Sequence, residues 1–332
     1  MAQGLIMPGR RTLLAGAALA VPALRRATAA PTVVQVGGLA QSQVQIVLDV
    51  LKTQGMDRKR DILVESRTYP TLDAVFTAIR GAQVDIGSGG WTAIAQFRSR
   101  NIPVVMFMPV GRGVSLDVMV RKDSPLRTLA DLADRKIGSF AGASGTATVL
   151  LRVLTKNYYG YDPAETGRLQ FAGPGLLPTL VERGELDAAL MFDPVASRSL
   201  LSGKFRSLGN LSDIYREKVG DDFLWIGFST NDTYMHANPR VLSGFAEAWV
   251  EAVAYVKANP QVYQSYITSQ GFDASQAGML AERMNADYVQ EWTPATIASL
   301  RRFATFARGV MGPGYLDQFV DAAFTTDFYP KA

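Results

Sequence analysis

Four short segments of the 332-residue chain have the residue types of ligand-binding turns, rich in glycine and serine or ending in an acidic residue. They are residues 37–41, 87–91, 142–146 and 192–193. Each is expected between a strand end and a helix start, where unpaired backbone N–H groups carry partial positive charge. One exposed helix terminus contributes only about 0.3–1 kcal/mol, and one such turn alone is more simply explained as an ordinary connection. Their convergence in one crevice predicts a site for a small ligand, and the partial positive charge at the helix starts favours an anionic one.

Residues that catalysis would need are sparse. The chain has no cysteine and one histidine, which excludes cysteine nucleophiles, iron–sulfur clusters and a two-histidine metal site. Gly203-Lys204 is followed by Phe205, so the phosphate-binding loop of nucleotide hydrolases is absent, and no Gly-x-Ser-x-Gly elbow occurs. A serine triad would need His236, which precedes a helix cap at Asn238 and is expected on the surface. We therefore predict no enzyme, no metal and no cofactor.

Alternating strands and helices must position these turns. Strands are expected at 32–36, 61–66, 84–86 and 103–108, with helices near 43–51, 71–79 and 91–97 between them. A second series follows at 116–121, 136–139, 169–171, 188–192 and 223–229, with a capping box at Thr128–Asp131. This order predicts two mainly parallel sheets flanked by helices.

The C-terminal third is expected to be helical. Asn238-Pro239, Asn259-Pro260 and Thr293-Pro294 are typical helix starts. The aromatic side chains of this region could form a ligand cage, but their helical spacing favours core packing. They include Tyr263, Trp292, Phe303 and Phe306.

A family resemblance covers most of residues 32–260. Residues 120–132 (Val-Arg-Lys-Asp-Ser-Pro-Leu-Arg-Thr-Leu-Ala-Asp-Leu) resemble the start of the second lobe in extracytoplasmic solute-binding proteins. Residues 81–87, 136–138, 142–146, 184–189 and 192–194 continue the pattern in order. The chain most resembles the sulfonate, nitrate and thiamine-precursor group of ABC transporter binding proteins. Phe192 stands where a tryptophan is common in sulfonate binders.

The resemblance implies a two-lobed periplasmic binding protein fold of type II, with two α/β lobes joined by two hinge strands. Lobe I would combine residues 30–117 with 228–332, and lobe II would span residues 118–227. The strands at 116–121 and 223–229 are the expected hinges, in which a few residues absorb the rotation on closure.

The resemblance also implies the ligand-binding residues. They are Gln41, Ser88, Trp91, Ser144, Gly145, Thr146 and Asp193. Ser144 and Thr146 would hold an anion. Trp91 either covers an apolar part of the ligand or packs in the lobe core. Asp193 either meets an amino or ring N–H group or caps a helix, and Arg112 is either a counter-charge or a surface residue.

The N-terminus is expected to be a cleavable export signal, residues 1–29. Arg10 and Arg11 precede the uncharged stretch 12–24, which is shorter than the roughly 20 residues that span a bilayer. The adjacent arginines are typical of the twin-arginine type. The signal holds four of the 34 basic residues and no acidic one, so the remainder has 30 of each. The excess charge of +4 therefore does not indicate nucleic-acid binding.

Together these observations predict a monomeric periplasmic protein that captures a small organic anion for an ABC permease and its ATPase subunit. A thiamine-precursor pyrimidine, another neutral or aromatic solute, and a ligand-sensing role stay open as alternatives. An exported hydrolase is a weaker alternative. An iron-dependent pyrimidine synthase of the same fold would need cysteines, which the chain lacks.

Overall fold

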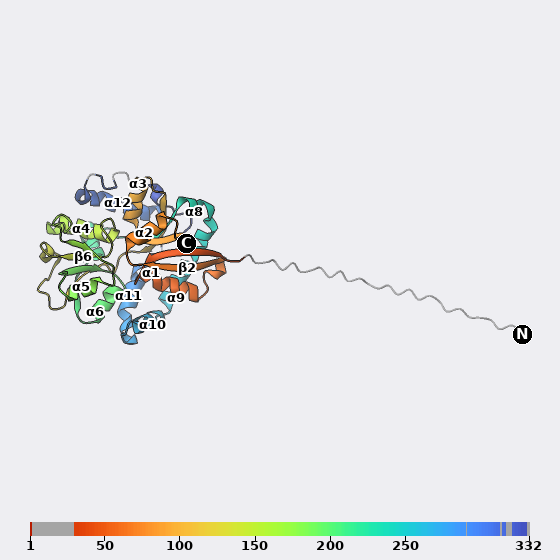
Figure 1. The fold of residues 1–332 in the computed structure, drawn as a ribbon, viewed down its shortest axis with the longest axis horizontal. Coiled ribbons are helices and arrows are strands. Elements are labelled where there is room, and N and C mark those ends of the chain that lie inside the picture. The colour runs from red at the N-terminus through yellow and green to blue at the C-terminus, as the bar shows by residue number, and fades with distance from the viewer. Residues whose placement is uncertain (2–29, 290, 313, 317–320, 331–332) are drawn as a thin grey trace. The chain divides into compact units, whose positions relative to one another are not determined.

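Two five-stranded sheets with the same strand arrangement form the framework of the protein (Figure 1). The computed structural model describes residues 1, 30–289, 291–312, 314–316 and 321–330, so the predicted export signal and its cleavage site near Ala29 lie outside the described residues. Residues Pro31–Ala332 make up one unit, to which the following description applies. Within its described part, no helix is both long and apolar enough to span a bilayer.

The first sheet has the strand order β2-β1-β3-β10-β4. Its strands are β2 (Ile62–Tyr69), β1 (Thr32–Leu39), β3 (Ile86–Gly90), β10 (Ile226–Asn231) and β4 (Val104–Gly111). The strand β1 is parallel to β2 and β3, whereas β10 runs antiparallel between β3 and β4. The helices that follow these strands are α1 (Gln43–Thr53), α2 (Leu72–Arg80), α3 (Trp91–Ser99), α8 (Asp232–Ala237) and α9 (Pro239–Ala258).

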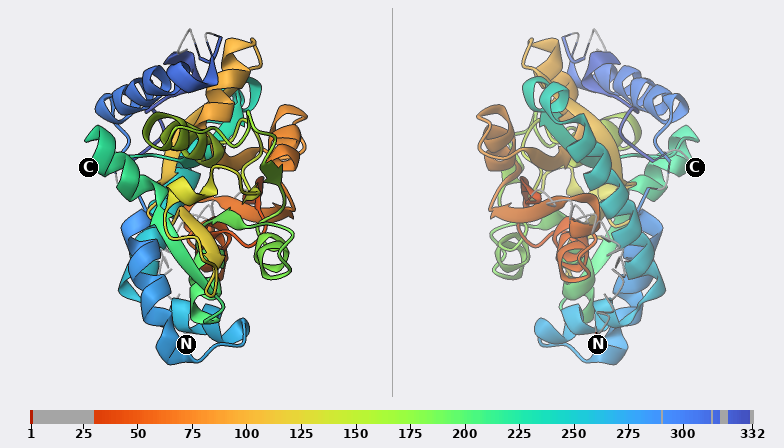
Figure 2. Two further views of the ribbon diagram at one scale, coloured as in Figure 1. Left: turned by 90° about the vertical axis from the view of Figure 1, so that its left-hand side faces the viewer. Right: turned by 90° about the vertical axis from the view of Figure 1, so that its right-hand side faces the viewer.

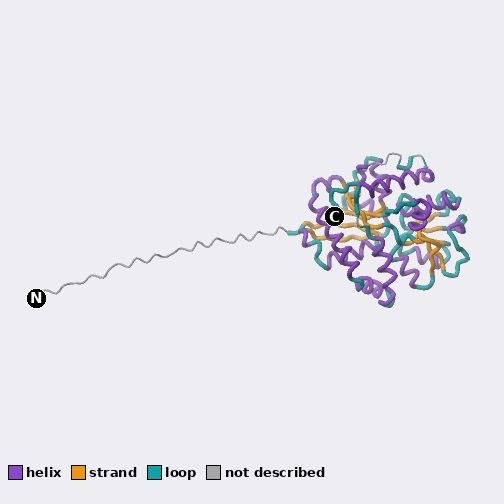
Figure 3. The backbone as a smooth tube through the Cα atoms, turned by 180° about the vertical axis from the view of Figure 1, so that it is seen from behind, coloured by secondary structure: helices purple, strands orange, loops and turns teal. Residues whose placement is uncertain are grey.

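The second sheet repeats this plan in the order β7-β6-β8-β5-β9. Its strands are β7 (Leu169–Phe171), β6 (Ile137–Ser139), β8 (Ala188–Met191), β5 (Asp117–Arg121) and β9 (Phe205–Asn210). Its helices are α4 (Thr146–Tyr159), α5 (Leu177–Glu182), α6 (Val195–Leu201) and α7 (Leu211–Val219). Figure 3 shows the two groups of strands with helices around each. The predicted α/β class, with two helix-flanked sheets, is confirmed.

The chain passes between the sheets twice. The first link, residues 112–116, joins β4 to β5, and the second lies between α7 and β10. The expected hinge strands at 116–121 and 223–229 begin within the links and continue as β5 and β10, and each of these two strands belongs to one sheet. The proposed assignment of residues 30–117 and 228–332 to one lobe stays a prediction.

Two turn predictions are wrong in part or in full. Residues 37–39 of the turn expected at 37–41 are the end of β1 and pair with β2. Residues 87–90, expected as a turn after a strand, are the body of β3, because all four residues pair with the antiparallel β10. The glycines permit this strand to lie directly on α2, since a Cβ at Gly87 would overlap Ile79. The helix α3 then starts without a loop, at Trp91.

The C-terminal segment is helical, as expected. It contains α10 (Gln261–Ser269), α11 (Ala277–Asp287) and α12 (Pro294–Met311). Figure 2 shows α12 (dark blue) and α10 (lighter blue) at opposite ends of the view. Tyr263, Trp292 and Phe303 are buried and Phe306 packs against the core, which confirms packing over a ligand cage. The short 3-10 helices are Arg58–Arg60, Leu129–Leu132, Ala274–Gln276 and Asp321–Ala323.

Candidate functional site

A small cavity lies where the carboxyl ends of parallel strands from both sheets face each other. About 280 Å³ of space there is free of protein atoms, but this volume includes open solvent, and only about 20 Å³ of it admits the centre of a water molecule. Leu39 ends β1 and Ser88 lies in β3, while Phe140 follows β6 and Phe192 follows β8. The remaining lining residues are Ser42, Val44, Leu72, Gly89, Trp225 and Ile226. Strand ends of an α/β sheet are the usual place for a ligand, so this cavity is the candidate site.

Three aromatic rings form one wall of the cavity. The ring centroids of Phe140 and Phe192 are 4.3 Å apart. The Trp225 ring lies 5.9 Å from Phe140 and 5.3 Å from Phe192, edge to face with both. All three side chains are buried. This wall suits an apolar or aromatic part of a ligand.

The other wall contains the start of helix α1. Ser42 is the N-cap residue of this 11-residue helix, but its side chain caps no backbone N–H. Its hydroxyl oxygen is buried and has no hydrogen-bond partner. A buried hydroxyl without a partner costs roughly 1–3 kcal/mol, and a ligand atom placed there recovers that cost. Ser88, also buried, adds a second hydroxyl to the lining. The cavity therefore has an apolar wall and a polar end at a helix N-terminus.

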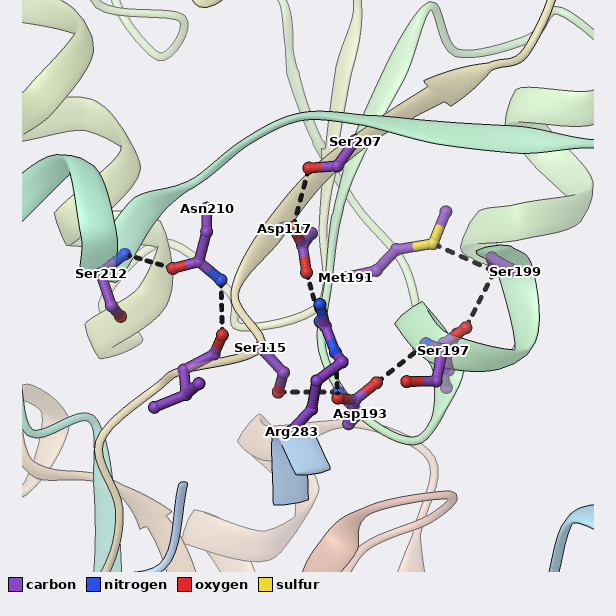
Figure 4. A network of polar contacts seen from close by, with 12 residues as sticks. Ser115, Asp117, Met191, Asp193, Ser197, Ser199, Ser207, Asn210, Ser212 and Arg283 are labelled. Atoms are coloured by element: carbon purple, nitrogen blue, oxygen red, sulfur yellow. Dashed lines mark hydrogen bonds and ion pairs between the residues drawn. The ribbon is translucent and has the colours of Figure 1, made fainter. Parts of the chain in front are cut away.

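Two polar networks lie between the sheets, and each is centred on one residue of α11. In the first, Arg283 donates from Nε to Oδ2 of Asp193 at 2.7 Å and from Nη2 to Asp117 (Figure 4). Asp193 is fully buried and its Oδ1 accepts the N–H of Ser197 at 2.8 Å. Its own N–H donates to the hydroxyl of Ser115 at 3.1 Å. The carboxylate therefore caps the start of α6 and pairs with an arginine.

The second network surrounds Asp287, which is fully buried at the end of α11. Its Oδ2 accepts from Nε2 of Gln43 at 2.5 Å, and its Oδ1 accepts from the N–H of Val114 at 2.7 Å. Burial raises the pKa of this carboxyl to about 6, although the hydrogen bonds from Gln43 and Val114 oppose the rise, as does the nearby indole N–H of Trp225, which makes no hydrogen bond of its own.

The predicted turn residues meet across the two sheets. Thr146, the first residue of α4, accepts the N–H of Thr92 at its Oγ1 at 3.1 Å, so it caps α3 from the other sheet. The carbonyl of Ser144 accepts the Thr92 hydroxyl at 2.8 Å, and Gly145 is the N-cap of α4. This approach requires glycine at position 90, where a Cβ would stand 2.5 Å from Thr146 Oγ1. Gln41, exposed and with a positive φ of 56°, accepts from Arg198 of α6 at 2.7 Å.

Other predicted residues lie away from the cavity lining. Trp91 is fully buried. Its indole N–H donates to the Leu224 carbonyl at 2.8 Å, and the centroid of its ring lies 5.6 Å from that of Phe303. Of the two roles open to Trp91, these contacts describe core packing. Arg112 has an exposed side chain on the first link, as a surface arginine would. Of the seven predicted residues, Ser88 alone is in the lining, and their roles in binding stay predictions.

Sequence reasoning missed Ser42, Phe140 and Trp225. Ser42 adjoins the predicted Gln41 and precedes a helical pattern, so its helix-cap type was a usable signal. Phe140 directly follows a predicted strand, at the same relative place as Phe192. Trp225 comes from the second link, and no local pattern marked it. No cluster of three metal-ligating side chains occurs among the described residues.

Comparisons with known proteins agree with this architecture. The family model described as NMT1/THI5 like matches residues 58–262. The fold is similar to a Bordetella bronchiseptica RB50 protein (TM-score 0.74, 19% identity, 91% of this chain and 96% of that one). It is also similar to the alkanesulfonate-binding protein SsuA from Xanthomonas axonopodis pv. citri bound to MOPS (TM-score 0.72, 18% identity, 90% and 99% covered). A third is the periplasmic aliphatic sulphonate binding protein SsuA from Escherichia coli (TM-score 0.66, 19% identity, 86% and 96% covered). No curated protein matched.

Proposed function

The chain belongs to the NMT1/THI5-like family, and from this premise we propose that it is the solute-binding component of an ABC importer. It would act in the periplasm as a monomer, capture one small solute between the two sheets, and present it to the permease and its ATPase partner. The observation that carries the proposal is the cavity at the strand ends, with walls from both sheets. Ligand in such a place favours the closed arrangement of the lobes, which a permease can distinguish from the open one.

The lining supports a ligand with an anionic head and an apolar body. The head would sit at the N-terminus of α1, where the free Ser42 hydroxyl and the helix dipole favour negative charge. The body would lie against Phe140, Phe192 and Trp225. Two of the similar structures are sulfonate-binding proteins, which is the same ligand chemistry. We therefore propose an organosulfonate or a related carboxylate.

A neutral aromatic solute is the second candidate. The specific observation in its favour is that no basic side chain is among the residues that line the cavity. An anion would rely on hydroxyl groups and one helix terminus alone, each of which contributes modestly. A ring with a polar edge could occupy the same aromatic wall without that requirement.

The two candidates can be separated with a matched ligand series. An alkanesulfonate, the corresponding carboxylate, the corresponding alcohol and a pyrimidine would be tested for thermal stabilisation and by calorimetry. A ligand present at 100 times its Kd adds about 2.7 kcal/mol to the free energy of unfolding. If none of the four stabilises the protein, the ligand class is wrong. Turnover of any of them by the isolated protein would instead indicate an enzyme.

The Ser42→Ala variant tests where the head binds. Loss of one hydrogen bond to a charged group would weaken sulfonate binding by roughly tenfold or more and leave the alcohol nearly unchanged. Ser269→Ala is the matched control, because Ser269 is exposed at the end of α10 and its hydroxyl bonds only to the carbonyl of Tyr266 and the side chain of the adjacent Gln270, away from the cavity. Equal affinities of the Ser42→Ala variant and the parent for sulfonate would place the head elsewhere.

A further inference from the structure

Asp287 joins the ligand cavity to the first link between the sheets. Its carboxylate accepts hydrogen bonds from the side chain of Gln43, in the first turn of α1, and from the backbone N–H of Val114, in the link. Its backbone carbonyl also accepts the N–H of Arg112 at 2.9 Å. One residue thus contacts the helix that begins at the cavity and the segment that would bend on closure.

The carboxyl group of Asp287 is close to the polar end of the cavity. Gln43 directly follows Ser42, whose hydroxyl faces the cavity without a partner. The indole N–H of Trp225, part of the aromatic wall, faces the same carboxyl group. A negative charge on Asp287 therefore lies behind the helix terminus at which an anionic head would bind.

No counter-charge compensates this carboxyl group among the residues described. Arg283, one turn earlier on α11, pairs with Asp117 and Asp193 instead. Arg112 on the link contributes its backbone to Asp287 and has an exposed side chain. Of the other ionisable neighbours, Tyr288 is fully buried with its pKa raised by that burial, and the charge of Asp193 adds to the rise in the pKa of Asp287. From α1, the nearest group is the uncharged amide of Gln43.

Gln43 can satisfy Asp287 in either protonation state. Its Nε2 donates to the carboxylate, while its Oε1 is buried without a partner. Rotation of the amide would bring this oxygen to a protonated carboxyl, which then donates to it. The buried site is thus built to keep a hydrogen bond through a change of charge.

We propose that Asp287 is a positioning residue through which protonation controls anion binding in the cavity. The proposal rests on the proposed function, with its anionic head at Ser42. The charged carboxylate opposes a second negative charge at the start of α1, and the protonated carboxyl does not. Affinity for an anionic solute therefore increases as the medium becomes more acidic, and affinity for a neutral solute of the same shape does not.

The test is the Kd of the intact protein for butanesulfonate and for butanol between about pH 8 and about pH 5. A sulfonate keeps its charge throughout this range, so the protein alone titrates. We expect roughly tenfold tighter sulfonate binding at the acidic end, which corresponds to a rise of about one pH unit in the pKa of Asp287 on binding. Calorimetry in buffers of different ionisation enthalpy would show proton uptake on sulfonate binding near pH 6, and this measurement needs no variant.

The Asp287→Asn variant should bind sulfonate with no such pH dependence. Its amide can still accept from Val114 and donate to Gln43. The matched control is Asp57→Asn, because Asp57 is also buried and accepts the N–H groups of Arg58 and Val64, away from the cavity. The control should keep the pH dependence of the parent.

The outcomes separate the two levels of the proposal. Sulfonate binding that is independent of pH, or proton uptake that persists in Asp287→Asn, overturns the role of Asp287 and leaves the proposed function intact. A lack of sulfonate binding at every pH overturns the anionic ligand class, and the role of Asp287 with it.

Discussion

Two sites with buried carboxylates are centred on residues one helical turn apart on α11, Arg283 and Asp287. They differ in how the negative charge is compensated. At Arg283, the carboxylates of Asp117 in β5 and of Asp193, which follows β8, share one guanidinium group. At Asp287, one carboxylate has hydrogen-bond donors and no ion pair among the described residues. A paired buried charge is strongly fixed, because removal of either partner leaves the other uncompensated. An unpaired buried carboxyl can instead change its protonation state at moderate pH, and so can respond to its surroundings.

The largest effect is expected at the paired site. Arg283→Met leaves Asp117 and Asp193 buried without a counter-charge and should lower the free energy of unfolding by about 3–5 kcal/mol. Urea denaturation would measure it. Arg60→Met is the control, since Arg60 pairs with Glu247 and Glu251 near the surface, and should cost less than about 1 kcal/mol. Equal costs for the two variants would show that the buried triad has no special structural role.

The next effect concerns the pH dependence of stability at the unpaired site. The pKa of Asp287 is about 6 in the folded protein, against 3.8 for the free group. A raised carboxyl pKa stabilises the folded state most below about pH 4, and this contribution is lost as the pH rises through about 6. Relative to Asp287→Asn, the parent should therefore gain up to roughly 3 kcal/mol on acidification through this range. Urea midpoints at a series of pH values would measure the difference, and a constant difference would contradict it.

A smaller effect is expected from the donor to Asp287. Gln43→Leu removes a hydrogen bond to a buried charged group and should cost roughly 1.5–3 kcal/mol at about pH 8. The cost should shrink at about pH 5, where the carboxyl is largely protonated. Gln45→Leu, two residues along the same helix and half-buried, should show neither the cost nor its pH dependence. A larger loss of stability in Gln45→Leu than in Gln43→Leu would mean that Gln43 does not stabilise the charged form of Asp287.

The smallest effect is expected at the exposed rim of the same interface. Gln41 accepts from Arg198 across the two sheets, but this hydrogen bond is exposed to water, although Arg198 itself is half-buried. Gln41→Ala should change the free energy of unfolding by less than about 0.5 kcal/mol. The free energy of unfolding of this variant should depend on pH as that of the parent does, and urea denaturation at a series of pH values would measure it. If Gln41→Ala lost as much stability as Gln43→Leu, burial would not explain why the Gln43–Asp287 contact matters more than the Gln41–Arg198 contact.

Local patterns in the sequence predicted most of the framework. The capping box at Thr128 and Asp131 is present, and α12 begins at Pro294 with Thr293 as its cap. Such features depend on residues three or four positions apart, which a sequence displays directly. The turn predicted at 87–90 failed because its conformation is set by pairing with β10, far along the chain.

The candidate site was predictable only in part for the same reason. Ser88 lies near the carboxyl end of β3, so topology brings it to the cavity. Arg283 and Asp193 are separated by 90 positions, and Asp287 and Gln43 by 244, with no periodic pattern that relates them. The aromatic wall likewise joins Trp225, from the link, to rings that follow β6 and β8. Contacts of this kind arise from packing between elements, which no local window contains.

The placement of β10 has a consequence for how the chain matures. The strands of the second sheet occur in one uninterrupted stretch from Asp117 to Asn210, so they can pair as soon as that stretch has left the ribosome. The first sheet is different, because β3 and β4 flank a strand that is synthesised only after the whole second sheet. Until β10 (Ile226–Asn231) is synthesised, one edge of β3 and one edge of β4 have no strand to pair with. Unpaired edges can pair with strands of other chains. We therefore expect the nascent N-terminal half to be more prone to aggregation than the second sheet.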